Sequence, residues 1–183
     1  PCNDEFPEGT PTMHVDEFVR GKGKFFITEY VPTVEKVNGK FPLIMTTGRI
    51  LAHYNVGAQT RRTKNSEWHD EDLIEMHPHD AEERGINERD WVGINSRSGD
   101  TVLRAKITDR VQPGVVYTTF HHPVSGANVI TTDNSDWATN CPEFKVTAVQ
   151  VTKVTQPSNW QSKYQKFSEK QIDFVKNGVE KVS

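Results

Sequence analysis

Short apolar runs, closely separated by turn-forming residues, set the strongest limit on how this chain can fold. Between residues 41 and 154, Gly, Pro, Asn and Asp interrupt the sequence before any apolar run exceeds the length of a strand. These runs do not alternate with long helices, so the chain lacks the βαβ rhythm of a doubly wound parallel sheet. The pattern predicts a mainly β fold, and among mainly β folds it favours a barrel.

Six runs in this region have the length and pattern of strands, and they cover residues 41–47, 73–76, 91–96, 101–109, 115–120 and 145–154. The sequence "RSGD" joins the third and fourth runs as a hairpin loop. One short helix is expected to begin at Pro78, with carboxylates in its first turn, and to end at Gly85. Residues 24–31, "KFFITEYV", also alternate like a strand and end at Pro32.

The two ends of the chain differ from its centre. Residues 1–40 have little periodic pattern and are expected to form a linker or connecting arm, followed by one domain at 41–155. In residues 156–183, Trp160, Tyr164 and Phe167 recur at helical spacing, and Ile172, Val175 and Val179 continue the stripe. We therefore expect a C-terminal helical tail that docks on another surface. Because the chain begins with Pro1 rather than Met, we also expect a piece of a longer protein.

Composition excludes several classes of partner. A hydrophobic content of 34% and a mean hydropathy of −0.68 predict a modest core with long polar loops. The net charge of −3 gives no general attraction for nucleic acid. No apolar stretch approaches the roughly 20 residues of a membrane helix, so no membrane insertion is expected. Cys2 and Cys141 form no recognisable framework, which favours unpaired thiols in a reducing, cytoplasmic compartment.

The segment "TTGRILAHYNVGAQTRRT" (46–63) places many hydrogen-bond donors directly after a predicted strand. Gly48 has no Cβ and would let the backbone approach a ligand closely. Arg49 offers five donors in a planar fork that suits phosphate. His53, Tyr54 and Asn55 add polar groups and a flat ring. The segment suits a ligand with a phosphate and a polar heterocycle; the alternative is a long surface loop with capping threonines.

A second long segment follows the predicted strand at 115–120. Residues 120–145 have no regular pattern, and loops of this length in compact domains are usually functional or disordered. The Asn128 amide can read donor and acceptor edges of a heterocycle. Lys145, at the predicted start of the last strand, can neutralise a phosphate. We therefore favour function over disorder here.

Two histidine pairs invite a metal interpretation, at His77 and His79 and at His121 and His122. Zinc requires three or four convergent ligands, and neither pair has a recognisable third. We expect no metal site and predict surface histidines at both pairs. The basic run at 61–64 is expected to form a solvated patch or to contact a phosphate or a partner.

Four motifs in order resemble the C-terminal domain of the molybdenum/tungsten bis-pterin guanine dinucleotide oxidoreductases. They are "TTGRILAHYNVGAQTRR", "HPHDAEERGINERDWVGINSRSG", "PGVVYTTFHH" with Asn128, and "PEFK". The segments "HYNVGAQTRRT", "FHHP…GANVIT" and "QPSNWQ" are most similar to the large (alpha) subunit of NAD-dependent formate dehydrogenase. Related nitrate reductases carry a similar TGR…H…TRR pattern, so the choice between formate dehydrogenase and nitrate reductase stays open.

The resemblance implies a six-stranded double-psi β-barrel that binds bis-molybdopterin guanine dinucleotide, with molybdenum or tungsten. By position it implies the following cofactor-lining residues: Thr47, Gly48, Arg49, Ile50, Leu51, His53, Tyr54, Asn55, Val56, Phe120, Asn128 and Lys145.

The resemblance also implies what this chain lacks. In the family, the metal-ligating Cys or selenocysteine, the catalytic His and Arg and the iron–sulfur cysteines lie in other domains, and neither cysteine here matches them. The parent enzyme would oxidise formate to CO2 and pass electrons through pterin and iron–sulfur clusters to NAD. The expected partners are the remaining domains of the large subunit and the other formate dehydrogenase subunits. The rival interpretation is an independent double-psi barrel that acts as a binding module.

Overall fold

The computed structural model describes every residue except 1, 3, 11–13, 15–16, 19 and 180–183, and it describes 171–179 by their backbone only. The chain divides into two units, Pro1–Pro32 and Thr33–Ser183. The described residues of the first unit contain no helix or strand. The strand predicted at 24–31 is therefore wrong, and its Phe25 and Ile27 side chains are fully exposed. Alternation alone does not make a strand, because a strand also needs a hydrogen-bonding neighbour.

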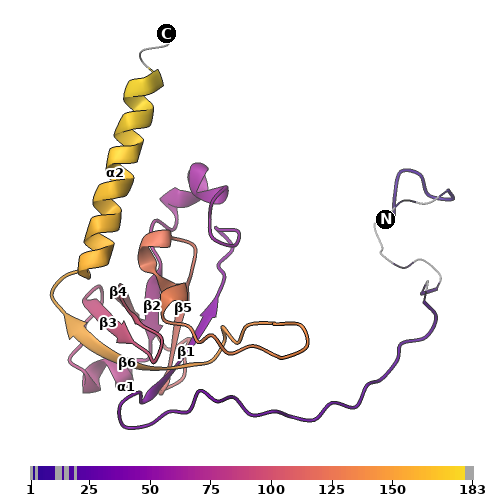
Figure 1. Cartoon of the computed structure of the whole chain (residues 1–183), viewed down its shortest axis with the longest axis horizontal. Helices are drawn as coiled ribbons and strands as arrows, with labels where there is room; N and C mark the ends of the chain where they lie inside the picture. The colour runs from indigo at the N-terminus through magenta and orange to yellow at the C-terminus, as the bar shows by residue number, and fades with distance from the viewer. Residues whose placement is uncertain (1, 3, 11–13, 15–16, 19, 180–183) are drawn as a thin grey trace. The chain divides into compact units, whose positions relative to one another are not determined.

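The second unit is built on a closed barrel with the strand order β1-β5-β2-β4-β3-β6 (Figure 1). The strands are β1 (Leu43–Gly48), β2 (Leu73–Met76), β3 (Trp91–Asn95), β4 (Asp100–Ile107), β5 (Val115–Thr119) and β6 (Thr147–Val154). Strands β1 and β5 pair in parallel, as do β2 and β4, and antiparallel pairs complete the ring. The fold is a double-psi β-barrel, as the resemblance implied.

The predicted strands between residues 41 and 154 are confirmed, with small shifts at their ends. The hairpin across "RSGD" pairs β3 with β4, placing Asn95 opposite Asp100. Helix α1 (Pro78–Glu83) begins at the predicted proline. His77 caps it, since Nδ1 accepts a hydrogen bond of 3.1 Å from the His79 N–H. This contact satisfies one of the free donors of the first turn.

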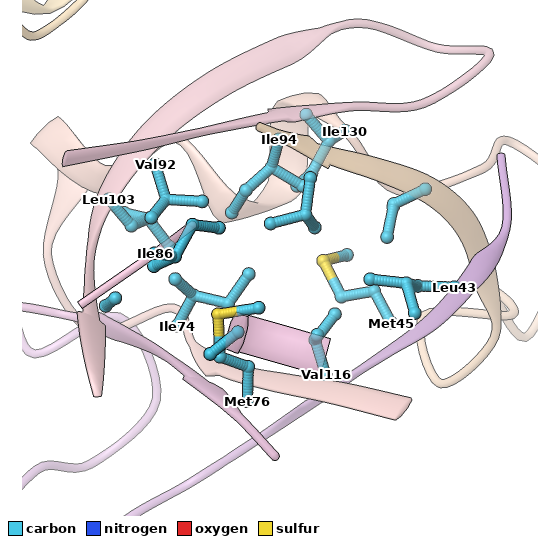
Figure 2. Packing of buried hydrophobic residues seen from close by; sticks show 14 residues of the cluster. Leu43, Met45, Ile74, Met76, Ile86, Val92, Ile94, Leu103, Val116 and Ile130 are labelled. Carbon is cyan, nitrogen blue, oxygen red and sulfur yellow. The ribbon is translucent and has the colours of Figure 1, made fainter. Parts of the chain in front are cut away.

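The barrel interior is a continuous apolar cluster (Figure 2). Buried and half-buried residues alternate along β1 because successive side chains of a strand point to opposite faces. Met45, Ile74, Val92 and Val116 come from four different strands, and all four are fully buried. Figure 2 shows these side chains converging from around the barrel. Apolar burial of this kind supplies the main favourable term in folding.

Two long connections leave the same end of the barrel, because β1 and β5 are parallel neighbours. The connection after β1 contains the 3-10 helices η1 (Thr60–Arg62) and η2 (Lys64–Glu67). The connection after β5 contains η3 (Pro123–Ser125) and η4 (Ala127–Val129), so its predicted lack of structure is wrong in part. Figure 1 shows the purple segment after β1 beside the orange segment after β5.

Helix α2 (Asn159–Val179) follows the last strand. Gln161 anchors its first turn, since Oε1 accepts from the Val102 N–H and Nε2 donates to the carbonyls of Val102 and Val124. Tyr164 and Phe167, further along, are 38% and 60% exposed. The predicted continuation of the stripe through Ile172, Val175 and Val179 lies outside the side chains described. In the part of the chain that the structure covers, no helix combines the length and apolarity needed to cross a membrane.

Candidate functional site

The end of β1 is shaped by a close contact between Gly48 and Tyr117. A Cβ at Gly48 would lie 2.4 Å from the Tyr117 hydroxyl oxygen, a distance that real Cβ atoms do not reach. The same hydroxyl donates a hydrogen bond of 3.1 Å to the Arg49 carbonyl. Glycine at position 48 therefore makes room for a tyrosine of the neighbouring strand, whereas the sequence alone suggested room for a ligand.

Arg49 joins the two long segments that the sequence singled out. Its Nε and Nη2 atoms lie 3.2 and 2.9 Å from Asn55 Oδ1. Its guanidinium carbon lies 5.3 Å from the centre of the Phe120 ring, which comes from the other segment. An amide oxygen has no net charge, so Asn55 orients the exposed guanidinium without neutralising it. The arrangement presents a fixed cation at the surface.

A second cation is held at the same strand end. The Lys145 ammonium donates to the carbonyl of Thr47, and the Thr47 hydroxyl donates a bond of 2.8 Å to the carbonyl of Phe144. Strand β6 begins at Thr147, so Lys145 precedes the strand rather than starting it as predicted. The position of the Lys145 ammonium is fixed instead by the backbone at the end of β1. Arg49 and Lys145 thus flank one strand end.

Asn128 lies between two clefts. The smaller, of about 220 Å³, is lined by Phe120, Val56 and Asn128 among others. The larger, of about 660 Å³, includes Thr131 and Phe144 together with Asn128. The Asn128 side chain is exposed, so its amide is free to meet a ligand from either cleft. The two clefts offer aromatic walls with a polar group between them, a combination typical of ligand sites.

The remaining predicted site residues divide by exposure. Leu51 and Tyr54 project into solvent, at 107% and 67% exposure. Ile50 contributes its N–H, which donates to the ring of His121 at 3.2 Å. His53 lies beneath the loop, where Nδ1 contacts Thr60 Oγ1 at 3.0 Å and Nε2 contacts the His69 carbonyl at 2.7 Å. Since both ring nitrogens are engaged, His53 supports the loop from below.

Comparison with known proteins places this chain in a family. The family profile described as "Molydopterin dinucleotide binding domain" matches residues 43–148. This chain belongs to that family. It is 40% identical to the alpha subunit of F420-dependent formate dehydrogenase from Methanocaldococcus jannaschii and 36% identical to that of F420-dependent formate dehydrogenase 1 from Methanococcus maripaludis. Each match spans 84% of this chain and 23% of the relative's length.

A solved structure agrees on the fold of this family member. Acetylene hydratase from Pelobacter acetylenicus superimposes with a TM-score of 0.54 over 62% of this chain and 18% of the hydratase. Sequence identity between the two is 15%, so the likeness concerns the fold alone.

The donor set of this family member fits a dinucleotide with phosphates. Arg49 and Lys145 supply two exposed cations that are far apart in the sequence, and Asn128 supplies an exposed amide. Phosphate is recognised by cations and N–H donors, and a base or pterin by amides and flat apolar walls. The site offers both kinds of group at one end of the barrel.

Asp72 is a buried residue of this region that sequence reasoning missed. Its carboxylate accepts from the Thr119 hydroxyl at 2.5 Å and from the N–H groups of His121 and His122 at 3.1 and 2.8 Å. Burial raises its pKa, but the nearby His122 ring, the Thr119 and Ser125 hydroxyls and the His122 N–H outweigh burial and lower the pKa to about 2. The one available signal was an acidic residue directly before the buried strand "LIEM".

The prediction of surface histidines at His121 and His122 is wrong. His121 is fully buried and His122 is 8% exposed, because the Asp72 carboxylate binds the backbone of both. The His122 Nδ1 atom lies 3.3 Å from Asp72 Oδ1, a contact that becomes an ion pair when the ring is protonated but is not an aligned hydrogen bond. Burial also lowers the pKa of His121.

The other pair, His77 and His79, lies at α1 as expected. His79 lies within 4.8 Å of acidic oxygens on Asp80 and Glu83, as a metal site would require. Asp80 already accepts a hydrogen bond of 2.8 Å from the Gly114 N–H, and His79 is 3.8 Å from Glu83. Asp80 is thus buried and bonded to backbone, whereas His79 and Glu83 are exposed side chains of the same helix.

Proposed function

We propose that the barrel binds one molybdopterin guanine dinucleotide of a bis-cofactor molybdenum or tungsten centre. The observation that carries this proposal is the pair of cations, Arg49 and Lys145, held at the end of β1 by uncharged oxygens. Arg49 would meet a phosphate through its planar fork, and Lys145 would add a second positive charge. Asn128 would read a heterocycle edge between the two clefts.

We propose further that the barrel serves a cytoplasmic formate dehydrogenase. The cofactor, when bound, would supply the chemistry that oxidises formate to CO2, a proton and two electrons. This chain would bind and orient the dinucleotide, which is the usual contribution of protein to cofactor chemistry. The other domains of the large subunit and the other subunits would supply the metal ligand and the iron–sulfur clusters. We expect no formate-dependent dye reduction by the 183-residue chain alone, and measurable reduction would contradict this division of roles.

The electron acceptor has two candidates. The segments "HYNVGAQTRRT" and "QPSNWQ" favoured an NAD-dependent enzyme, whereas the relatives at 36% and 40% identity are named as F420-dependent. Purified complete enzyme, supplied with formate and either acceptor, discriminates between them by the absorbance of the reduced product. Nitrate reductase activity is the alternative that the shared TGR…H…TRR pattern supports, and the same preparation tests it with nitrate and a reduced dye.

Arg49 provides the test of cofactor binding. A charge-assisted hydrogen bond contributes roughly 1.5–3 kcal/mol, so Arg49→Ala should weaken binding by about ten- to a hundred-fold. Arg49→Lys should recover part of it, since the charge remains and the fork is lost. The measurement is molybdenum or tungsten and guanine nucleotide content of the purified complete enzyme. Arg110→Ala, which removes another exposed arginine of the barrel, is the matched control. Full occupancy in Arg49→Ala would contradict the proposal.

We also propose that the outer part of α2 docks on the rest of the enzyme. Gln161 ties the first turn to β4, whereas Phe167 further along is largely exposed. A chain that ends at Ser168 should therefore keep the barrel folded, by circular dichroism, and assemble more weakly with the rest of the enzyme. Loss of the folded barrel would show that the outer turns stabilise it instead.

A further inference from the structure

His121 connects the two long segments through its ring. Nδ1 donates a hydrogen bond to the Asn55 carbonyl, and Nε2 accepts one of 3.2 Å from the Ile50 N–H. A carbonyl can only accept and a backbone N–H can only donate, so the contacts determine the tautomer. The ring must be neutral, with its proton on Nδ1. Only this form satisfies both backbone groups of the loop 49–57.

The backbone of the loop also packs closely against the main chain of His121. A Cβ at Gly57 would lie 2.6 Å from the His121 carbonyl oxygen, and Gly57 has a φ of +72°. Asn55, whose carbonyl meets the ring, has a φ of 46°, a conformation that asparagine tolerates better than most residues. His121 therefore contacts the loop through both its ring and its main chain.

Asp72 holds His121 from the opposite side. Its Oδ1 accepts from the His121 N–H at 3.1 Å and from the Thr119 hydroxyl at 2.5 Å. The carboxylate is buried and ionised, and it fixes the backbone that carries the imidazole. The chain of contacts runs from Asp72 through His121 to the loop that carries Arg49.

We infer that His121, anchored by Asp72, is a positioning residue that presets the loop 49–57 before the dinucleotide binds. This inference rests on the proposed function, because that function gives the loop its ligand. The contacts of His121 with the loop do not depend on it. The preset loop holds Asn55 where its side chain orients the Arg49 fork. A loop that is already ordered loses less conformational freedom on binding, so the site binds more tightly. His121 itself contacts the loop, and its side chain is fully buried.

The contact depends on pH, because protonation of Nε2 would set its N–H against the Ile50 N–H. The groups that face the ring are Asp72, His53 and His122, with Arg49 beyond Phe120. Burial lowers the pKa of His121 from 6.5, the two histidines lower it further, and the Asn55 carbonyl and Asp72 partly oppose this. Since the folded-state pKa of His121 is below 6.5, the value of an unfolded chain, the contact is fully present above pH 6.5 and is lost as the pH falls through the lower value.

Hydrogen exchange on the 183-residue chain tests the positioning without any ligand. At a pH of about 7.5, the Ile50 amide should be protected, and His121→Phe and His121→Gln should each reduce its protection by about tenfold. Stepwise lowering of the pH of the wild type below 6.5 should reduce Ile50 protection in the same direction once the pH passes the lowered His121 pKa, after correction for intrinsic exchange. Amides of β1 should be unaffected. His79→Asn, an exposed histidine outside the site, is the control. Unchanged Ile50 protection in both variants, or an imidazole ¹⁵N spectrum with the proton on Nε2, would overturn the inference.

Binding of guanosine diphosphate, used as a probe, tests the consequence. At a pH of about 7.5, His121→Gln should weaken binding of guanosine diphosphate by several-fold relative to the wild-type chain. Equal binding by wild type and variants that have lost Ile50 protection would overturn the claim that the preset loop serves the site. Absent binding by the wild type, with the exchange results as expected, would count against the proposed function and leave the positioning contact established.

Discussion

The barrel interior and the polar cluster at the ends of β1 and β5 are equally buried and are built on opposite principles. The interior is an apolar set in which Met45 and Ile74 are fully buried. The strand-end cluster, formed by Asp72, Thr119, His121, His122 and His53, is also buried but consists of polar groups. Apolar contact has no preferred direction, whereas each hydrogen bond of the cluster requires one donor, one acceptor and one protonation state. The interior therefore supplies stability, and the cluster supplies conformation and sensitivity to pH.

Truncation inside the apolar set should have the largest effect. Ile74→Ala should destabilise the chain by about 2–5 kcal/mol, because it removes buried methyl groups and leaves a cavity. Urea unfolding near pH 7.5 and near pH 5 measures the loss, which should be the same at both. Leu51→Ala, at a fully exposed site, should change stability by less than about 0.5 kcal/mol. A pH-dependent loss at Ile74 would break the distinction between the two regions.

Removal of the Asp72 charge should have the next largest effect and should depend on pH. Its pKa is lowered to about 2 from 3.8, which corresponds to about 2 kcal/mol of stability. Since the folded-state pKa is the lower one, this stability is present above pH 3.8 and is lost as the pH falls through about 2. Asp72→Asn should remove most of it at neutral pH, so the acid limb of its stability curve should be flatter than that of the wild type.

Asp136→Asn is the control for the Asp72 experiment. The pKa of Asp136 is also lowered to about 2, by hydrogen bonds from Thr139 and neighbouring backbone, but its side chain is exposed. Its replacement should change the acid limb less than Asp72→Asn does. Equal effects would mean that burial of Asp72 does not strengthen its hydrogen bonds.

A pair of glycine substitutions separates close packing from backbone conformation. Gly57 and Gly85 both have positive φ, at +72° and +62°, but only Gly57 faces an atom that an added Cβ would meet. Gly85→Ala should cost about 1 kcal/mol for conformation alone, whereas Gly57→Ala should cost about 1–3 kcal/mol and displace the loop from His121. Thermal unfolding measures the cost and hydrogen exchange at Ile50 detects the displacement. Equal costs with unchanged exchange would mean that the loop does not depend on contact with His121.

Loss of the Arg49 side chain should have the smallest effect on stability. The side chain is exposed and bonded to an amide, so Arg49→Ala should cost about 0–1 kcal/mol by urea unfolding. The same substitution should weaken dinucleotide binding by about ten- to a hundred-fold in the complete enzyme. A large loss of stability would mean that Arg49 mainly stabilises the fold beside the strand-end cluster instead.

Local patterns predicted elements whose stabilising groups are close in sequence. Pro78 at the first turn and His77 before it specify α1, and "RSGD" between two alternating runs specifies the β3–β4 hairpin. The same reasoning failed at 24–31, which alternates equally well but has no neighbouring strand among the described residues. For the site, the sequence identified the two segments that meet, because each follows a predicted strand and carries donors.

The sequence by itself determined the six barrel strands, the short helix, the barrel class and, through four spaced motifs, the family. Only the tertiary structure decided that the strand order brings β1 beside β5, so that Asp72 could bind the backbone of His121 and His122. Two similar histidine pairs lie at 77 and 79 and at 121 and 122, yet His77 caps α1 with His79 exposed, whereas His121 and His122 are buried. The physical reason is that burial of a polar residue depends on its hydrogen-bond partner. For His121 that partner lies 49 residues earlier in the chain, beyond the reach of any local pattern.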